Sequence, residues 1–220
     1  MELSFFQQIL RSVASGMKIP VIIILIIFLA FAVFCIGWIL VETFTERKNM
    51  NYNVPKLLDK LKKGNESIEN CVKSSGLLMR QKDALLELTK HPEFDEEMME
   101  SLADNLIEKE QAHYDVILKL TNIVSKLAPM VGLLGTLIPL GPGIIALGQG
   151  DTTTLAESML TAFDTTIAGL IAAAICLIIH TIRNHWYAGY MSDLETLIDC
   201  VTDLEIKQIE NKSEAGMEAR

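Results

Sequence analysis

Residues 19–41 read IPVIIILIIFLAFAVFCIGWILV, a run of 23 residues that contains no charged side chain. As an α-helix this run is about 34 Å long, which is enough to cross the hydrocarbon core of a bilayer. Lys18 and Glu42 bracket the run, and Pro20 lies in its first turn, where a helix tolerates proline. A cleaved signal peptide is the alternative, since Ala30-Phe31-Ala32 resembles a cleavage site, but nine more apolar residues follow that site. The run therefore predicts a membrane helix that the mature protein retains.

Two further uncharged runs predict a second and a third membrane helix. They cover residues 127–148 and 165–182, and the third reaches membrane length only if it begins near residue 159. The segment between them, residues 149–158, is short and polar, so the two helices are expected to form a hairpin. Three separate runs of near-membrane length disfavour the alternative, a buried hairpin of a soluble protein.

The composition of the whole chain agrees with this division. Half of the 220 residues are hydrophobic and the mean hydropathy is +0.32, yet 21 % of the residues are charged and the net charge is −9. The apolar residues must therefore be segregated from the charged ones. The apolar fraction excludes intrinsic disorder, the acidic balance disfavours nucleic-acid binding, and the four scattered cysteines exclude a disulfide framework.

Lysine and arginine residues indicate the orientation of the helices. Thirteen of them lie in residues 42–126, and none lies in residues 149–160. Cytoplasmic segments of membrane proteins carry an excess of basic residues, so the long segment is predicted to be cytoplasmic and the hairpin loop external. The predicted topology is N-out and C-in.

The predicted cytoplasmic segment has helical periodicity. From Phe94 to Val124 apolar residues recur every three or four positions, which predicts one helix running into the second span. The third span continues in the same way past Arg183 to Ile209, before a small polar tail that we expect to be disordered. We therefore predict an all-α membrane protein with three transmembrane helices, two of them extended into a cytoplasmic helical bundle. The predicted segments are an external amphipathic helix (1–18), transmembrane helix 1 (19–41), a cytoplasmic helical insert (42–126), transmembrane helix 2 (127–148), an external loop (149–158), transmembrane helix 3 (159–182), and a cytoplasmic helix and tail (183–220).

The second run contains two closely spaced prolines. Proline donates no amide hydrogen bond, so Pro139 and Pro142 leave the carbonyl groups of Gly135 and Ile138 without helical donors. Bare carbonyls are costly in lipid, and we therefore predict a helix break that lines a polar pathway. The residues of this break are Pro139, Gly141, Pro142 and Gly143. Small residues also favour close packing of the two hairpin helices, and the predicted packing residues are Gly132, Gly135, Gly169 and Ala173.

Threonines accompany these features on both helices of the hairpin. Thr136 lies on the second run, and Thr165 and Thr166 lie on the third, next to Asp164. A single threonine in a membrane helix often bonds only to its own backbone, but several on adjacent helices resemble the wall of an ion pathway. Asp164 lies near the outer end of its span, so we expect the proton-carrying acid of any relay to come from another chain. The predicted ion pathway comprises Thr136, Thr165, Thr166 and Asp164.

Two motifs in the hairpin resemble the MotA/TolQ/ExbB proton channel family. They are APMVGLLGT at residues 128–136 and TTIAGLIAAA at residues 165–174, and the three-span layout is similar to TolQ and ExbB rather than to four-span MotA. The resemblance implies a homo-oligomer, expected to be a pentamer, in the cell inner membrane. It further implies a single-span partner like MotB, ExbD or TolR, whose membrane aspartate carries the proton. Thr136 and Thr166 match the pore threonines of the family.

The chain departs from the pattern of TolQ and ExbB at three places. Thr161 stands where these proteins have a glutamate, and Asp164 follows one turn later, either as a substitute or without a role. Thr165 replaces an alanine, which gives a Thr-Thr pair similar to that of sodium-driven stators. Sodium prefers several hard oxygen ligands, which Thr136, Thr165 and Thr166 could offer as a transient site, so proton and sodium both remain open. The Gly141–Gly143 segment also differs.

The expected function is a pore or stator subunit that couples ion flow to mechanical work. A structural membrane scaffold without ion conduction is the alternative. We expect no enzymatic activity, because His180, Cys176 and Cys35 are the only reactive side chains in the spans and have no acidic partners in the sequence around them. We expect no cofactor and no resident metal ion.

Overall fold

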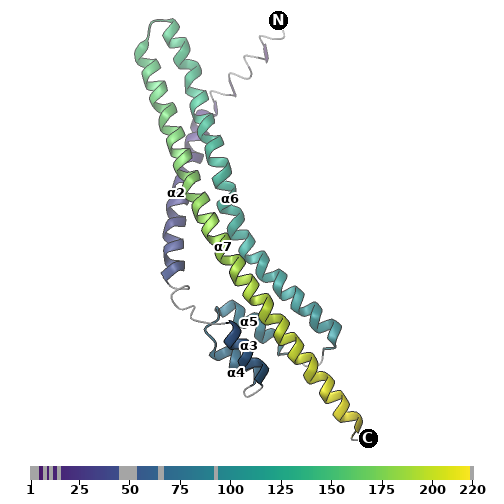
Figure 1. Ribbon diagram of the computed structural model, residues 1–220. Coiled ribbons are helices and arrows are strands. Elements are labelled where there is room, and N and C mark those ends of the chain that lie inside the picture. The colour runs from purple at the N-terminus through teal and green to yellow at the C-terminus, as the bar shows by residue number, and fades with distance from the viewer. Residues whose placement is uncertain are drawn as a thin grey trace. The chain divides into compact units, whose positions relative to one another are not determined.

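The computed structural model describes residues 16–44, 54–63, 67–91 and 94–218, together with residues 5, 6, 9, 12 and 13; the side chains of residues 62, 63 and 208–218 are outside this description. Over these residues every regular element is helical, which confirms the all-α prediction. The helices are α2 (Lys18–Glu42), α3 (Val54–Lys63), α4 (Ile68–Ser74), α5 (Met79–Leu88), α6 (Glu96–Gly148) and α7 (Thr152–Glu218) (Figure 1). The helix expected over residues 1–18 lies mostly outside the described residues.

Three of these helices are long and apolar enough to cross a membrane, namely α2, α6 and α7. This confirms the three predicted spans. Helices α6 and α7 continue far beyond their apolar segments, as the periodicity of the sequence predicts. The helical assignment of α7 extends to Glu218, so the expected loss of structure after Asn211 is wrong.

The predicted helix break is also wrong. Helix α6 is continuous from Glu96 to Gly148 and contains Pro129, Pro139 and Pro142 within it. A proline removes one backbone hydrogen bond, but packing against neighbouring helices compensates for that loss in membrane helices. Residues 139–143 are therefore helical, and the prolines change which carbonyl groups have donors without interrupting the helix.

The turn between α6 and α7 is shorter than the predicted loop of residues 149–158. Helix α6 ends at Gly148 and α7 begins at Thr152. Gly150 has a φ angle of 81°, a conformation that favours glycine. Asp151 then caps α7, because its carboxylate accepts hydrogen bonds from the backbone amide and the hydroxyl of Thr154.

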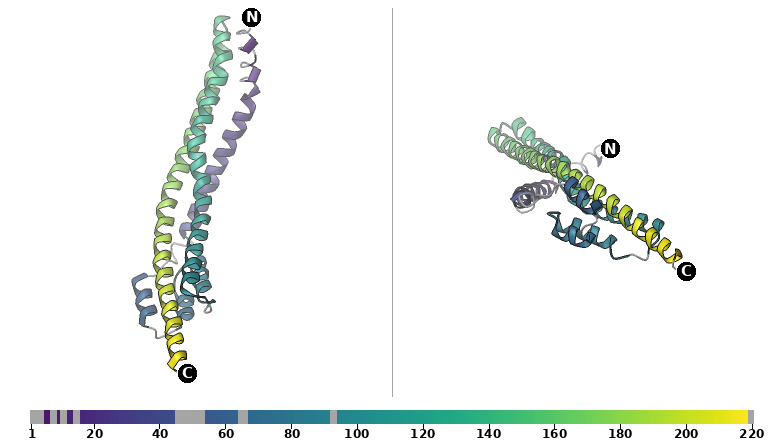
Figure 2. Two further views of the ribbon diagram at one scale, coloured as in Figure 1. Left: turned by 90° about the vertical axis from the view of Figure 1, so that its right-hand side faces the viewer. Right: turned by 60° about the horizontal axis from the view of Figure 1, so that its bottom comes forward.

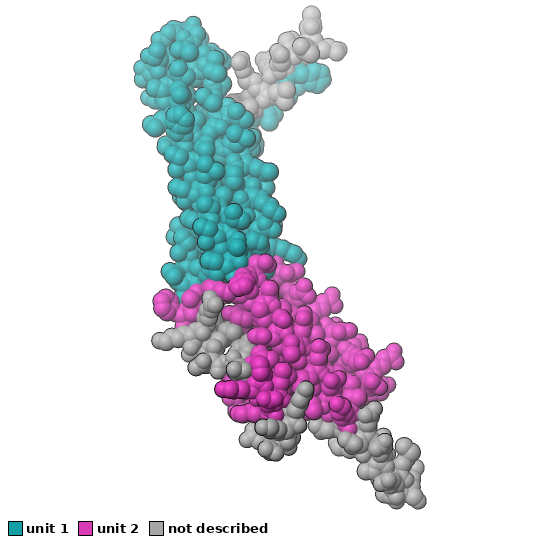
Figure 3. Space-filling model, in the orientation of Figure 1, with its two compact units in different colours: residues 1–40, 118–183 teal, residues 41–117, 184–220 magenta. Residues whose placement is uncertain are grey.

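The chain divides into two compact units, and α6 and α7 contribute to both. Unit 1 comprises residues 1–40 and 118–183, and unit 2 comprises residues 41–117 and 184–220 (Figure 3). Unit 2 contains helices α3, α4 and α5 packed against parts of α6 and α7. Its apolar core includes Leu85, Leu88, Met99, Leu197 and Ile198, all of which are fully buried. Apolar residues at helical spacing thus bury one face of each helix in a shared core.

Unit 1 contains α2 and the membrane part of the α6–α7 hairpin. Within unit 1, α6 and α7 lie side by side, as Figure 1 and both views of Figure 2 show. Ala32 of α2 is buried in one apolar cluster with Val124 and Ala128 of α6 and with Ala172 and Cys176 of α7. Helix α2 therefore covers one side of the hairpin and leaves the opposite side uncovered by the described residues of unit 1.

Candidate ion pathway

Helices α6 and α7 approach each other closely at three glycines of unit 1. A Cβ atom added to Gly169 would lie 2.7 Å from the carbonyl oxygen of Ala128, and one added to Gly132 would lie 3.2 Å from the carbonyl oxygen of Thr165. A Cβ atom added to Gly135 would lie 2.6 Å from the Cβ atom of Thr165. Because ordinary carbon–oxygen contacts need more room, only glycine allows the two backbones to approach this closely.

Thr165 lies inside this helix contact. Its side chain packs against Gly135, and the residue is only 8 % exposed. Its hydroxyl donates to the carbonyl oxygens of Ala162 at 2.9 Å and Thr161 at 3.1 Å, both on its own helix. Thr165 is thus buried between α6 and α7, on the side that α2 covers, because it also lines two cavities with α2 residues.

Asp164 lies on the side of the hairpin that α2 covers. It lines a cavity of about 130 Å³ together with apolar residues of α2. The α2 residues of this cavity are Ile22, Leu25, Ile26 and Leu29. A smaller cavity nearby brings Lys18 of α2 next to Ile138 and Pro139 of α6. Ile138 and Asp164 therefore mark the α2 side of α6 and of α7, respectively.

Thr136 and Thr166 lie on the opposite side of the hairpin. Each is two residues from the residue that marks the α2 side, since Thr136 precedes Ile138 and Thr166 follows Asp164. Two residues correspond to about 160° around an α-helix, so both threonines point away from α2. The Cα atom of Thr166 lies next to Gly132, and Thr136 is one turn further along α6. We call this side of the hairpin, with Thr136 and Thr166 in adjacent turns, the hydroxyl face.

The four predicted pathway residues therefore lie on two sides of the hairpin. Thr136 and Thr166 lie together on the hydroxyl face, whereas Thr165 packs against Gly135 and lines the cavity beside α2 together with Asp164. Both threonines of the hydroxyl face are half-buried, and their hydroxyls donate to their own helices. Thr136 donates to the carbonyl oxygen of Leu133 at 2.7 Å, and Thr166 donates to that of Ala162 at 3.2 Å.

The remaining predicted residues are similarly divided. Pro139 is buried and borders the Lys18 cavity, and Gly143 is buried against Ser158, where an added Cβ atom would lie 3.0 Å from the serine Cβ. Gly141 and Pro142 are exposed. Ala173 is buried in the cluster that contains Ala128. The four residues of the predicted helix break, Pro139, Gly141, Pro142 and Gly143, therefore do not form one continuous lining.

No group of three or more His, Cys, Asp or Glu side chains suited to a metal ion occurs among the described residues. The three threonine hydroxyls proposed for sodium do not converge, because Thr165 lies between the helices and the other two lie on the hydroxyl face. At the C-terminal end of α2, the guanidinium of Arg183 is 6.0 Å from the ring centre of Trp38, a pairing that sequence spacing alone could not reveal.

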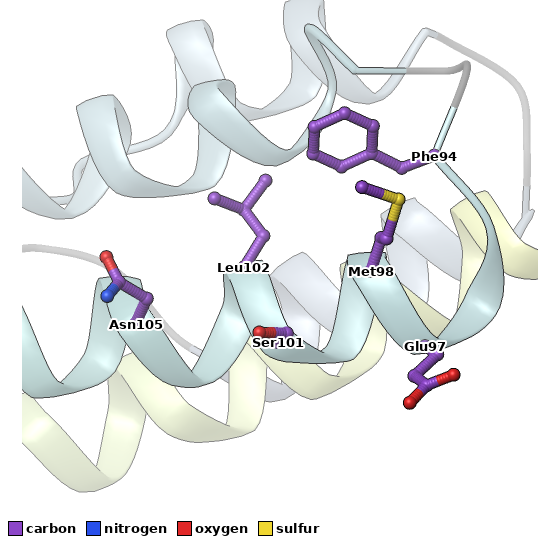
Figure 4. Close-up of a pocket in the computed structure, with 6 residues that line it drawn as sticks. All are labelled: Phe94, Glu97, Met98, Ser101, Leu102 and Asn105. Atoms are coloured by element: carbon purple, nitrogen blue, oxygen red, sulfur yellow. The ribbon is translucent and has the colours of Figure 1, made fainter.

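Unit 2 has an open groove of its own, of about 490 Å³, at the start of α6 (Figure 4). Phe94, Met98 and Leu102 point to the same side in Figure 4, while Glu97 points away from them. The groove is also lined by Ser101 and Asn105. None of the predicted pathway residues belongs to it.

The model of the MotA/TolQ/ExbB proton channel family matches residues 67–196, which is 130 of the 220 residues. The comparison with curated proteins gives no match. The matched region includes all of α6 and the part of α7 up to residue 196, and therefore Thr136, Thr165 and Thr166. The chain belongs to the MotA/TolQ/ExbB proton channel family and is a membrane subunit of the proton-channel type.

Proposed function

We propose that this chain is the pore subunit of a proton-driven, energy-transducing complex in the cell inner membrane. Five copies would surround the membrane helices of a single-span MotB/ExbD/TolR-like subunit. A membrane aspartate of that subunit would carry the proton, and its passage would move one set of subunits relative to the other. The proposal includes the N-out, C-in orientation, with unit 2 in the cytoplasm and the turn between α6 and α7 outside.

The observation that supports the proposal is the composition of the hydroxyl face. This face combines two hydroxyls in adjacent turns with exposed apolar side chains such as Leu133 and Leu170, which are 59 % and 54 % exposed. A pathway wall that is apolar apart from a few hydroxyls suits a proton that moves on a neutral carboxylic acid, because a bare ion would lose its hydration there.

The hydrogen bonds of Thr136 and Thr166 define what these residues can do chemically. A hydroxyl has one donor and two acceptor lone pairs, and in both residues the donor is used within the helix. The free lone pairs accept hydrogen bonds from water or from a protonated carboxylic acid, and an ionised carboxylate cannot donate to them. The two threonines therefore stabilise the protonated form of a passing acid.

The position of Thr165 favours protons over sodium. Sodium needs several oxygen ligands around one point, whereas one chain presents only Thr136 and Thr166 on the hydroxyl face. A complex that uses sodium would need most of its ligands from other chains.

The test is proton flux in liposomes that contain the purified complex and a pH-sensitive dye. We expect Thr136→Val and Thr166→Val each to lower the flux about tenfold, which corresponds to about 1.4 kcal/mol in the barrier. Thr161→Val is the matched control, because Thr161 also donates to its own helix, at 3.0 Å to the carbonyl oxygen of Glu157, but lies on the α2 side. The control should conduct like the wild type.

A structural scaffold is the second candidate, because tight glycine packing and threonines bonded to their own helices also suit a protein that only holds helices together. If the chain is a scaffold, the wild-type complex should show no proton flux, or a proton flux that is the same in Thr136→Val and Thr166→Val as in the wild type. Either result would refute the proposed pore.

A further inference from the structure

The uncharged runs of α2 and α7 lie at the same level along the membrane normal. Lys18, at the outer end of α2, borders the same cavity as Thr161 of α7. At the other end of the apolar run, the ring of Trp38 lies 6.0 Å from the guanidinium of Arg183. The uncharged run of α2 therefore lies beside residues 161–183, which include the uncharged run of α7. The uncharged runs of both helices therefore indicate the same position of the bilayer.

Helix α6 is shifted relative to that position. Ile138 and Pro139 border the cavity at Lys18, so the uncharged residues 140–148 lie beyond the outer end of α2. In the other direction, Val124 and Ala128 pack in one cluster with Ala32, near the middle of α2. The uncharged run of α6 thus ends at mid-membrane, and polar residues of α6 occupy the inner half.

The alternative is that the bilayer follows the uncharged run of α6. The part of α2 after Ala32 would then lie in water, although its side chains are strongly apolar and exposed. Val33, Phe34, Trp38 and Leu40 are 52–60 % exposed. Exposure of so many large apolar groups to water is unfavourable, so the alignment of α2 and α7 decides the position of the bilayer.

Lys126 consequently lies within the membrane. It is between Val124 and Ala128, at the level of Ala32, and six residues separate Ala32 from Trp38, which is about 9 Å along a helix. The lysine side chain leans toward the start of α6, the cytoplasmic end, but its reach of about 6 Å leaves the ammonium inside the level of Trp38. Its side chain is exposed and makes no ion pair with any described residue.

The direction of Lys126 follows from its neighbour. Val124 is buried in the cluster that contains Ala32 of α2 and Cys176 of α7, and Lys126 follows it by two residues, so Lys126 lies about 160° around α6 from that buried side. It is therefore on the exposed side of α6 that also carries Leu133 of the hydroxyl face, seven residues further along, and it is about 80° around the helix from Thr136 and nearer the cytoplasm. A charged ammonium at this depth is too costly to face lipid, so this side must border water or another protein.

We propose that Lys126 is the residue that excludes metal cations from the ion pathway. This inference rests on the proposed pore function. Each copy of the chain would place one ammonium in the inner half of the pathway, and the combined positive charge repels sodium and potassium ions. A proton reaches or leaves the partner's acid by transfer along hydrogen-bonded water, which does not require a desolvated metal ion to pass the ammonium groups. The fixed charge of Lys126 thus favours protons over sodium. The small number of sodium ligands on the hydroxyl face has the same effect.

The experiment measures sodium and proton flux in parallel, in liposomes that contain the purified complex. We expect Lys126→Gln to raise the sodium flux about tenfold, equivalent to about 1.4 kcal/mol, while the proton flux stays within twofold of the wild type. Lys126→Arg keeps the charge and should exclude sodium like the wild type. Lys119→Gln is the matched control, since Lys119 lies two turns toward the cytoplasm on the same face and should change neither flux.

A second variant covers the case in which Lys126→Gln does not assemble. Lys126→His is charged at low pH and neutral at high pH, so its sodium flux should rise as the pH increases from 5.5 to 8, around an ordinary histidine pKa of about 6.5. The wild type is measured over the same pH range for comparison.

Two results would overturn the inference. The first is obtained if the wild type conducts protons, Lys126→Gln has the same sodium flux as the wild type, and the sodium flux of Lys126→His does not change with pH. The second is an equal rise in sodium flux in Lys119→Gln, which would assign the effect to surface charge. A wild-type complex that conducts no ions would instead refute the pore function itself.

Discussion

Substitution of Gly169 by alanine tests the helix contact on which the hydroxyl face depends. The added methyl group would lie 2.7 Å from the carbonyl oxygen of Ala128 and 3.1 Å from the Cα atom of Gly132. Both contacts are with backbone atoms, which cannot rotate away as a side chain could. The helices must therefore separate by several tenths of an ångström, and Thr166 would move away from Thr136.

The expected change in the free energy of unfolding of Gly169→Ala is the result of two opposing effects. Overpacking of a tight contact costs about 1–3 kcal/mol. Alanine in a helix gains up to about 1 kcal/mol over glycine through its lower backbone entropy. We expect Gly169→Ala to lower the free energy of unfolding by about 1–2 kcal/mol, since the contact involves two backbone segments.

Gly189→Ala is the matched control for this prediction. Gly189 lies on the same helix, α7, but an added Cβ atom would meet nothing within 4 Å. Only the gain in helix propensity applies there, so the control should be stabilised by about 0.5–1 kcal/mol. The assay is denaturant unfolding in mixed micelles, followed by circular dichroism. The reasoning about close packing would be refuted if Gly169→Ala were as stable as Gly189→Ala.

Two further predictions concern the hairpin turn and its position. The hydrogen bonds from Thr154 lower the pKa of Asp151, so its cap stabilises α7 above the ordinary aspartate pKa and is lost as the pH falls through the lowered value. A pH titration of stability should show this loss, and Asp151→Asn should remove the pH dependence while a capping side chain is retained. Ile144 lies beyond the N-terminal end of α2, which the proposed orientation puts outside, so in a cysteine-free background Ile144→Cys should react with a membrane-impermeant thiol reagent added outside. A cysteine in the middle of α2 should not react, and equal protection of both would contradict the proposed shift of α6.

Much of the fold was accessible from the sequence because it depends on local composition. An uncharged run of 23 residues such as 19–41 is a membrane helix in almost any context, since the bilayer sets the required length. The apolar spacing from Phe94 to Val124 likewise predicted a helix that continues into the second span, and α6 confirms it. The family resemblance also depended on short contiguous motifs, and the match over residues 67–196 confirms it.

The proline prediction failed because it considered one helix alone. Pro139 and Pro142 do remove hydrogen bonds, but whether a helix breaks depends on the helices packed around it. In this chain α6 remains helical through both residues.

The arrangement of the candidate site was decided by tertiary structure. The sequence by itself determined that Thr136, Thr165, Thr166 and Asp164 lie on the hairpin helices and that the chain has three spans. Only the packing decided that Thr165 faces Gly135, that Asp164 faces α2, and that Thr136 and Thr166 share one face. It also decided that Lys126 is level with Ala32, although the sequence places it at the edge of an uncharged run. The physical reason is that rotation and offset of a helix are set by contacts with its neighbours, which residue composition along one helix does not determine.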